Sequence, residues 1–153
     1  MGFTLRATLD ILPPGASVIV AELLPEVVEW NRGPLGPLSG NPLKDRRVRI
    51  EICDVAVTLA SGSGKFDAVL LDVDNGPSAF AASTNGGLYG DRGLAAVRAA
   101  LKERGVLAIW SARDDRKFEQ RLRYGGFDVQ VHRVRGRVKK GGPRHTIFLG
   151  FKS

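Results

Sequence analysis

Strand-like and helix-like stretches alternate along nearly the whole chain, and two of the strand-like stretches are continuously apolar. Residues 68–71 (AVLL) and 106–110 (VLAIW) contain no polar side chain, which is typical of strands covered by helices on both faces of a sheet. Residues 47–52 (RVRIEI) instead alternate charged and apolar side chains. This alternation indicates a strand near a sheet edge with one face exposed to solvent. The alternation predicts an α/β fold with a mostly parallel sheet.

The remaining segments extend this prediction. A further strand is expected at residues 17–22, and the final two, 127–134 and 145–151, pair most simply as an antiparallel hairpin. Residues 32–45 are rich in Pro and Gly and predict a loop. Helices are expected from just after Gly2 to Leu12, at 25–31, at 91–105 and at about 114–124. In the 91–105 helix, Leu94, Val97 and Leu101 form the apolar stripe and Gly105 is the expected C-terminal stop.

Acidic residues follow three of the strand-like stretches. Glu22 and Asp72 stand at the ends of SVIVAE and DAVLLD, and Asp54 lies just past RVRIEI. In an open parallel sheet, ligands bind beyond the carboxyl ends of the strands. A carboxylate there can accept hydrogen bonds from ribose hydroxyls, an adenine amino group or a reacting amine. The three acids therefore predict one nucleoside-type pocket, although each one could also simply cap the turn that follows it.

The composition limits the class of protein. The chain has 153 residues, of which 43% are hydrophobic and 25% charged, as expected of one globular domain. Its single cysteine, Cys53, excludes an intramolecular disulfide and a cysteine-rich metal site, and we expect it to be a buried packing residue. No apolar run reaches the ~20 residues that span a bilayer, and the N-terminus lacks a secretion-signal pattern. We therefore expect a cytoplasmic protein without a membrane partner.

Five segments, in this order and spacing, carry a resemblance to a known family. They are VIVAELLPEVVEW, VRIEICDV, FDAVLLDVDNGP, LYGDRGLAAVRAALKERGVLAIW and the closing hairpin with its IFLGFK strand. With them the chain resembles the class I S-adenosylmethionine-dependent transferases, and among these the spermidine synthase (polyamine aminopropyltransferase)-like group. The resemblance covers nearly the whole chain. It implies a Rossmann-like class I methyltransferase fold and, as co-substrate, S-adenosylmethionine or decarboxylated S-adenosylmethionine, with no metal.

The resemblance also implies roles for individual residues. Glu22 matches the acid that binds the ribose hydroxyls, and Asp54, followed by Val55, matches the acid that binds the adenine amino group. Asp72 matches the first acid of an Asp-x-x-Asp motif, where the family places the catalytic base and part of the nucleoside site. Asp74 is the candidate second acid, although it stands at i+2 rather than i+3.

At the N-terminus, Gly2 matches the end of the family's glycine-rich loop and lies 20 residues before Glu22. The first strand of the family fold and the earlier glycines have no counterpart in this sequence. Residues 1–153 are therefore expected to form a single, incomplete domain that lacks the central first strand. Such a sheet would expose an edge, which would allow homo-oligomerisation.

Three functions are compatible with these features. The first is transfer of an aminopropyl or methyl group to a small amine-like acceptor, and the second is a truncated, non-catalytic Rossmann-like domain. The third is a nucleic-acid methyltransferase that uses residues 133–144, which contain six Lys or Arg and no acid. That segment has no aromatic residue to stack on bases, so we interpret it as a solvated hairpin tip and do not expect a nucleic-acid partner.

Aromatic and histidine residues outside these motifs are expected to be structural. Trp30 and Trp110 are predicted in the core or a pocket wall. Tyr89 matches a Leu-Tyr pair of the family, and core packing explains it equally well. His132 and His145 flank the hairpin and could face each other across its strands, but two histidines without nearby Cys or carboxylate do not make a metal site.

Overall fold

The computed structural model describes residues 2–72, 76–77, 86–136 and 142–153, so Asp74 lies outside the described residues. The chain divides into two compact units, Met1–Thr58 and Leu59–Ser153. That the whole chain forms one domain of the predicted kind stays a prediction.

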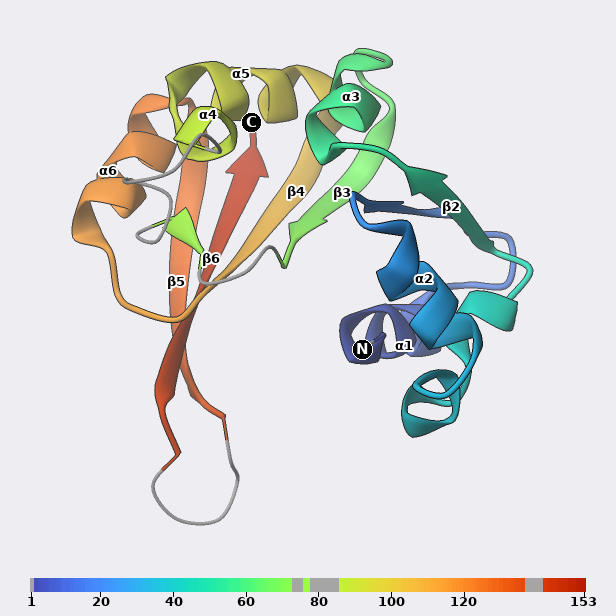
Figure 1. Cartoon of the computed structure of the whole chain (residues 1–153). Helices are drawn as coiled ribbons and strands as arrows, with labels where there is room; N and C mark the ends of the chain where they lie inside the picture. The colour runs from blue at the N-terminus through green and yellow to red at the C-terminus, as the bar shows by residue number, and fades with distance from the viewer. Residues whose placement is uncertain (1, 73–75, 78–85, 137–141) are drawn as a thin grey trace. The chain divides into compact units, whose positions relative to one another are not determined.

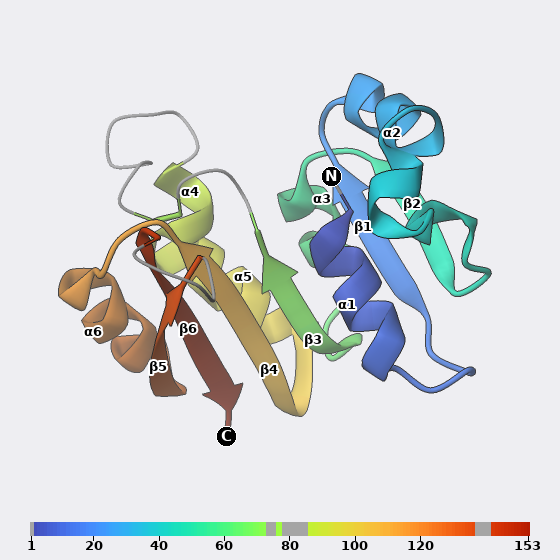
Figure 2. The same cartoon turned by 90° about the horizontal axis from the view of Figure 1, so that it is seen from below.

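The first unit is built on two parallel strands. β1 (Val18–Glu22) pairs with β2 (Val48–Ile52) from Val18 opposite Val48 to Glu22 opposite Ile52, and Figure 2 shows the two strands side by side. The helices of this unit are α1 (Phe3–Ile11), α2 (Pro25–Arg32) and the start of α3 (Val55–Ala60). The predicted loop at 32–45 holds two short 3₁₀ helices, Gly36–Ser39 and Pro42–Lys44, each with a proline in its first turn.

An ion pair fixes the start of β2. Arg47 Nη2 lies 2.7 Å from Asp45 Oδ2, and Arg47 Nη1 donates to the carbonyl of Leu12 at 2.8 Å. The hydrogen bonds and charge of Arg47 hold the pKa of the Asp45 carboxyl well below its usual range. Because Leu12 caps the C-terminal end of α1, this arginine joins that helix to the strand.

The second unit contains a four-stranded mixed sheet in the order β3-β4-β6-β5. Its β3–β4 pair is parallel, and its β4–β6 and β5–β6 pairs are antiparallel. The predicted α/β class and the C-terminal antiparallel hairpin are therefore confirmed, while the sheet of this unit is mixed rather than mostly parallel (Figure 1). Its elements are β3 (Phe66–Leu71), α4 (Gly86–Tyr89), α5 (Asp91–Ala100), β4 (Leu101–Ser111), α6 (Arg116–Tyr124), β5 (Phe127–Arg135) and β6 (Arg144–Lys152).

The prediction of a helix to Gly105 was wrong. α5 ends at Ala100, and Leu101 begins β4, where it pairs with Phe66. The register shifts between Phe66 and Ala68, and Arg104 adopts a positive φ of 66°. Leu101 is fully buried as predicted, but a strand rather than a helix buries it.

Aromatic rings join the helix layer of this unit to its sheet. The Phe118 ring on α6 meets Phe148 of β6 edge-on at 5.3 Å between centroids and Tyr89 at 5.8 Å. All three side chains are at most 3% exposed, and Asp115 caps α6 by accepting from the Phe118 amide at 2.9 Å. Leu122 of α6 is buried with these rings, and Tyr89 has the core-packing role that the sequence allowed.

In the described ranges, no helix combines the length and the apolar composition that crossing a bilayer requires.

Phe118→Ala is expected to destabilise the second unit by about 3–5 kcal/mol, because it removes a buried ring that contacts two others. Urea denaturation measures the change. Tyr124→Ala is the control on the same helix, since Tyr124 is 91% exposed and its loss should alter the free energy of unfolding by less than about 0.5 kcal/mol. Equal effects of the two substitutions would contradict the assignment of Phe118 to the core.

Candidate nucleoside-binding and catalytic site

The first unit brings Glu22 and Asp54 to the same edge of its sheet. Glu22 is the last residue of β1, opposite Ile52 of β2, and its carbonyl accepts the amide of Cys53 at 3.0 Å. Asp54 follows directly after Cys53. Because neighbouring strands lie about 4.8 Å apart, Glu22 and Asp54 lie side by side at the carboxyl ends of two adjacent parallel strands. The sequence predicted both acids at strand ends.

Both carboxylates use one oxygen in the turn that follows. Glu22 Oε1 accepts from the Leu24 amide at 3.0 Å, and Asp54 Oδ1 accepts from the Ala56 amide at 2.8 Å. Their turn-capping role is therefore real. The second oxygen of each carboxylate accepts no hydrogen bond from the described part of the chain. Glu22 is half-buried and Asp54 exposed, so each retains an acceptor for a ligand donor.

Two other predicted ligand residues also lie in this unit. Gly2 precedes α1 with φ at 74°, and a Cβ there would lie 2.9 Å from Ser39 Oγ and 3.0 Å from Pro42 Cγ. Close packing therefore requires glycine at this position whatever the ligand. Val55 is half-buried at the start of α3. That Gly2 and Val55 bind a nucleoside stays a prediction.

The second unit holds Asp72. Its neighbour Leu71 is the last residue of β3 and pairs with Ile109 of β4, so Asp72 lies beyond the carboxyl end of β3 at the level of Trp110. Asp72 is exposed. The half-buried Trp110 ring lies against the His145 ring at 5.1 Å between centroids. A carboxylate and an aromatic surface thus share this edge of the unit.

Gly76 packs tightly against the end of β4. Gly76 has a φ of 78°, and a Cβ there would lie 2.7 Å from Ser111 Cα and 2.8 Å from the Trp110 carbonyl oxygen. Gly76 and Pro77 are both buried. No signal in the sequence indicated this contact of Gly76 with β4.

Two expectations about aromatic and histidine residues were wrong. Trp30 is 55% exposed and lies neither in the core nor in the wall of the cavity of this unit described below. His132 and His145 do not oppose each other, because His132 pairs with Ile147 and His145 with Val134. Within the described ranges, no group of three or more His, Cys, Asp or Glu side chains could hold a metal ion.

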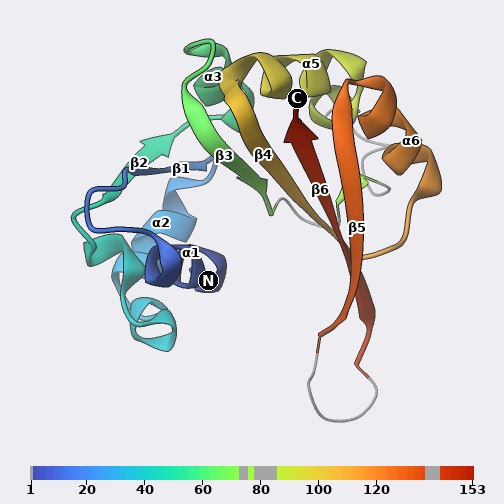
Figure 3. The same ribbon diagram turned by 180° about the vertical axis from the view of Figure 1, so that it is seen from behind.

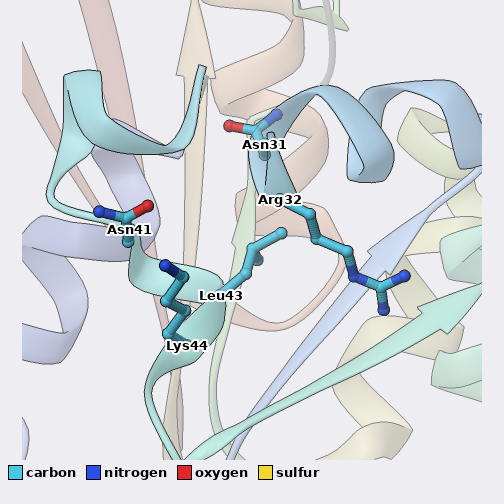
Figure 4. A pocket seen from close by; sticks show the side chains of 5 residues that line it. All are labelled: Asn31, Arg32, Asn41, Leu43 and Lys44. Carbon is cyan, nitrogen blue, oxygen red and sulfur yellow. The ribbon is translucent and has the colours of Figure 1, made fainter. Parts of the chain in front are cut away.

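A small cavity in the first unit had no signal in the sequence. It encloses about 200 Å³ and is lined by Asn31, Arg32, Asn41, Leu43 and Lys44. Figure 4 shows the Arg32 guanidinium extending away from the two asparagines, and Arg32 pairs with Glu29 at 2.7 Å. The buried Asn31 Oδ1 has no hydrogen-bond partner in the structure. Because one or a few water molecules could satisfy such an atom in a cavity of this size, we give this cavity no part in the proposed function.

Neither a protein-family model nor a curated protein sequence matches this chain. Several solved structures, however, match it. A spermidine synthase from Thermotoga maritima matches 99% of this chain with a TM-score of 0.74 at 20% identity, and a probable spermidine synthase from Corynebacterium glutamicum matches 96% with 0.67 at 18%. A precorrin-6y C5,15-methyltransferase from Geobacter metallireducens matches 97% of the chain and 75% of its own length, with 0.65 at 20% identity.

These similarities establish the fold. The chain has the Rossmann-like fold of the class I S-adenosylmethionine-dependent methyltransferases. Among proteins with this fold it is similar to spermidine synthases, as the sequence motifs indicated. It spans about half the length of the spermidine synthases it matches, namely 50% and 51% of those two chains.

Gly76→Ala is expected to destabilise the second unit by about 1–3 kcal/mol, because an alanine is strained at positive φ and its Cβ would meet the backbone of Ser111. Urea denaturation measures the loss. Gly87→Ala is the matched control, since a Cβ there meets nothing within 4 Å and alanine favours the helix by up to about 1 kcal/mol. A neutral Gly76→Ala would show that the segment after β3 does not pack as described.

Proposed function

We propose that this chain is a transferase domain that binds an S-adenosyl-type nucleoside and transfers an aminopropyl or methyl group to a small amine-like acceptor. The main support is the pair of carboxylates, Glu22 and Asp54, at one edge of parallel strands in a chain with this fold. We further propose a cytoplasmic location.

The hydrogen-bond acceptors of the first unit suit a nucleoside. Ribose hydroxyls and the adenine amino group are hydrogen-bond donors, and each of the two carboxylates has an oxygen that the described part of the chain does not use. In the proposal, Glu22 accepts from the ribose hydroxyls and Asp54 from the amino group, with Gly2 and Val55 beside the ligand. The bound S-adenosyl group would supply a carbon activated by a positively charged sulfur.

Asp72 is the proposed general base. An amine that attacks a carbon must lose a proton, and a carboxylate in hydrogen-bond reach can accept it while orienting the nitrogen. Asp72 is exposed at a strand end, where an acceptor could approach it. Asp74 is the proposed second acid. A polyamine is one member of the acceptor class.

Glu22→Gln and Asp54→Asn are each expected to weaken nucleoside binding about 10- to 100-fold, because hydrogen bonds to a charged group contribute about 1.5–3 kcal/mol. Both amides retain an oxygen for the turn bonds at Leu24 and Ala56, so the thermal stability should not change. Calorimetric titration with S-adenosylmethionine, decarboxylated S-adenosylmethionine and methylthioadenosine measures the affinities.

The control for these variants is Glu26→Gln, which makes the same charge change on an exposed residue of α2 and should bind like the wild type. If the wild-type chain binds none of the three ligands at millimolar concentration, the proposal fails and the non-catalytic alternative takes its place.

Asp72→Asn is expected to lower the transfer rate by about 10²–10⁴-fold, since it removes the proton acceptor. Nucleoside affinity should stay within about twofold, because the proposal assigns binding mainly to Glu22 and Asp54. Single-turnover assays with a panel of amines, beside calorimetry, separate the two effects. Asp128→Asn, on an exposed residue of β5, is the control. Wild-type rates in Asp72→Asn would exclude it as the base.

A further inference from the structure

β5 and β6 continue as a two-stranded ribbon past the rest of their sheet. β4 pairs with β6 only as far as Ser111 opposite Thr146, whereas Arg144 and His145 of β6 pair only with β5. Figures 1 and 3 show the two strands projecting beyond β3 and β4 of this unit. No helix of the second unit covers this projection in either view.

One face of the ribbon carries three arginines. Arg135 stands directly opposite Arg144, and Arg133 stands opposite Thr146. Because side chains alternate between the two faces of a strand, Arg133, Arg135 and Arg144 share one face. We call these three residues the basic ribbon. All three are exposed.

Only one of the three arginines is neutralised. Arg133 donates twice to Asp114 Oδ2, at 2.7 and 2.9 Å. Neither Arg135 nor Arg144 has a carboxylate partner within 4.0 Å among the residues that the structure describes. Arg123 of the same unit, by contrast, pairs with Glu119 at 3.0 Å.

This arrangement is unfavourable for the isolated protein. Like charges that stand directly opposite each other on antiparallel strands destabilise the pairing, and Arg135 and Arg144 are in that position. A polyanion that placed phosphates beside them would neutralise both. The chain as a whole, with a net charge of +7, would add long-range attraction.

We propose that the basic ribbon is a docking surface for the phosphate backbone of double-stranded nucleic acid. A two-stranded β-ribbon fits the major groove of a duplex, and arginines on its face would contact phosphates without reading the base sequence. Single strands are bound mainly by aromatic stacking, and residues 133–136 and 142–146 contain no aromatic ring other than His145, which lies against Trp110. This surface does not depend on the proposed transferase activity.

The sharpest test is Arg135→Glu in the full chain. The substitution places an acid opposite Arg144, so it should raise the melting temperature while it weakens duplex binding. Fluorescence anisotropy with a labelled duplex of about 25 base pairs, in a salt series, should show affinity about 10-fold lower and a slope of log K against log salt reduced by about 1. Arg144→Glu should behave in the same way.

Arg92→Glu is the control, since it makes the same charge change on an exposed residue of α5 and should keep wild-type binding. Absence of duplex binding by the wild type at low salt would overturn the proposal, as would equal losses in Arg92→Glu and Arg135→Glu. Tighter binding to a single strand of the same length would also overturn it. Binding to anionic phospholipid vesicles but not to the duplex would assign the ribbon to a lipid surface instead.

Discussion

Parallel strand pairing is the constraint on which the candidate site depends. In a parallel pair both strands end at the same edge, so the register of β1 with β2 places Glu22 beside Cys53 and therefore close to Asp54. The same geometry in β3 and β4 places Asp72 at the level of Trp110. An antiparallel pairing would send the two acids of the first unit to opposite ends, and they could not act on one ligand.

β6 contributes residues both to the core and to the exposed surface of the second unit. It runs antiparallel between β4 and β5, so one stretch of chain supplies the buried Phe148 of the core and the exposed Arg144 of the basic ribbon. The change from core to surface occurs at Thr146, the last residue of this end of β6 that pairs with β4. Arg144 and His145, which precede it in the chain, pair with β5. Beyond that point the ribbon has no neighbouring strand on its β4 side, and its charges face solvent.

Local patterns predicted much of this fold. The continuous apolar runs and the acids after three strands lie where the sequence placed them. The prediction failed at Leu101, whose apolar side chain suits both a helical stripe and a buried strand. Its pairing with Phe66, 35 residues earlier, decided between them, and no pattern within residues 91–105 contains that information.

The sequence by itself located the strands and the helices α1, α2, α5 and α6, except at residues 101–105, and showed that an acid follows three of the strands. These properties depend on side chains near one another in the chain. Tertiary structure decided which strands pair and in what register. That register sets Arg135 against Arg144 and separates His132 from His145. The close packing of Gly76 against Ser111 is a further contact that only the tertiary structure shows. Pairing depends on contacts between distant residues, whose burial and hydrogen bonding local preferences do not specify.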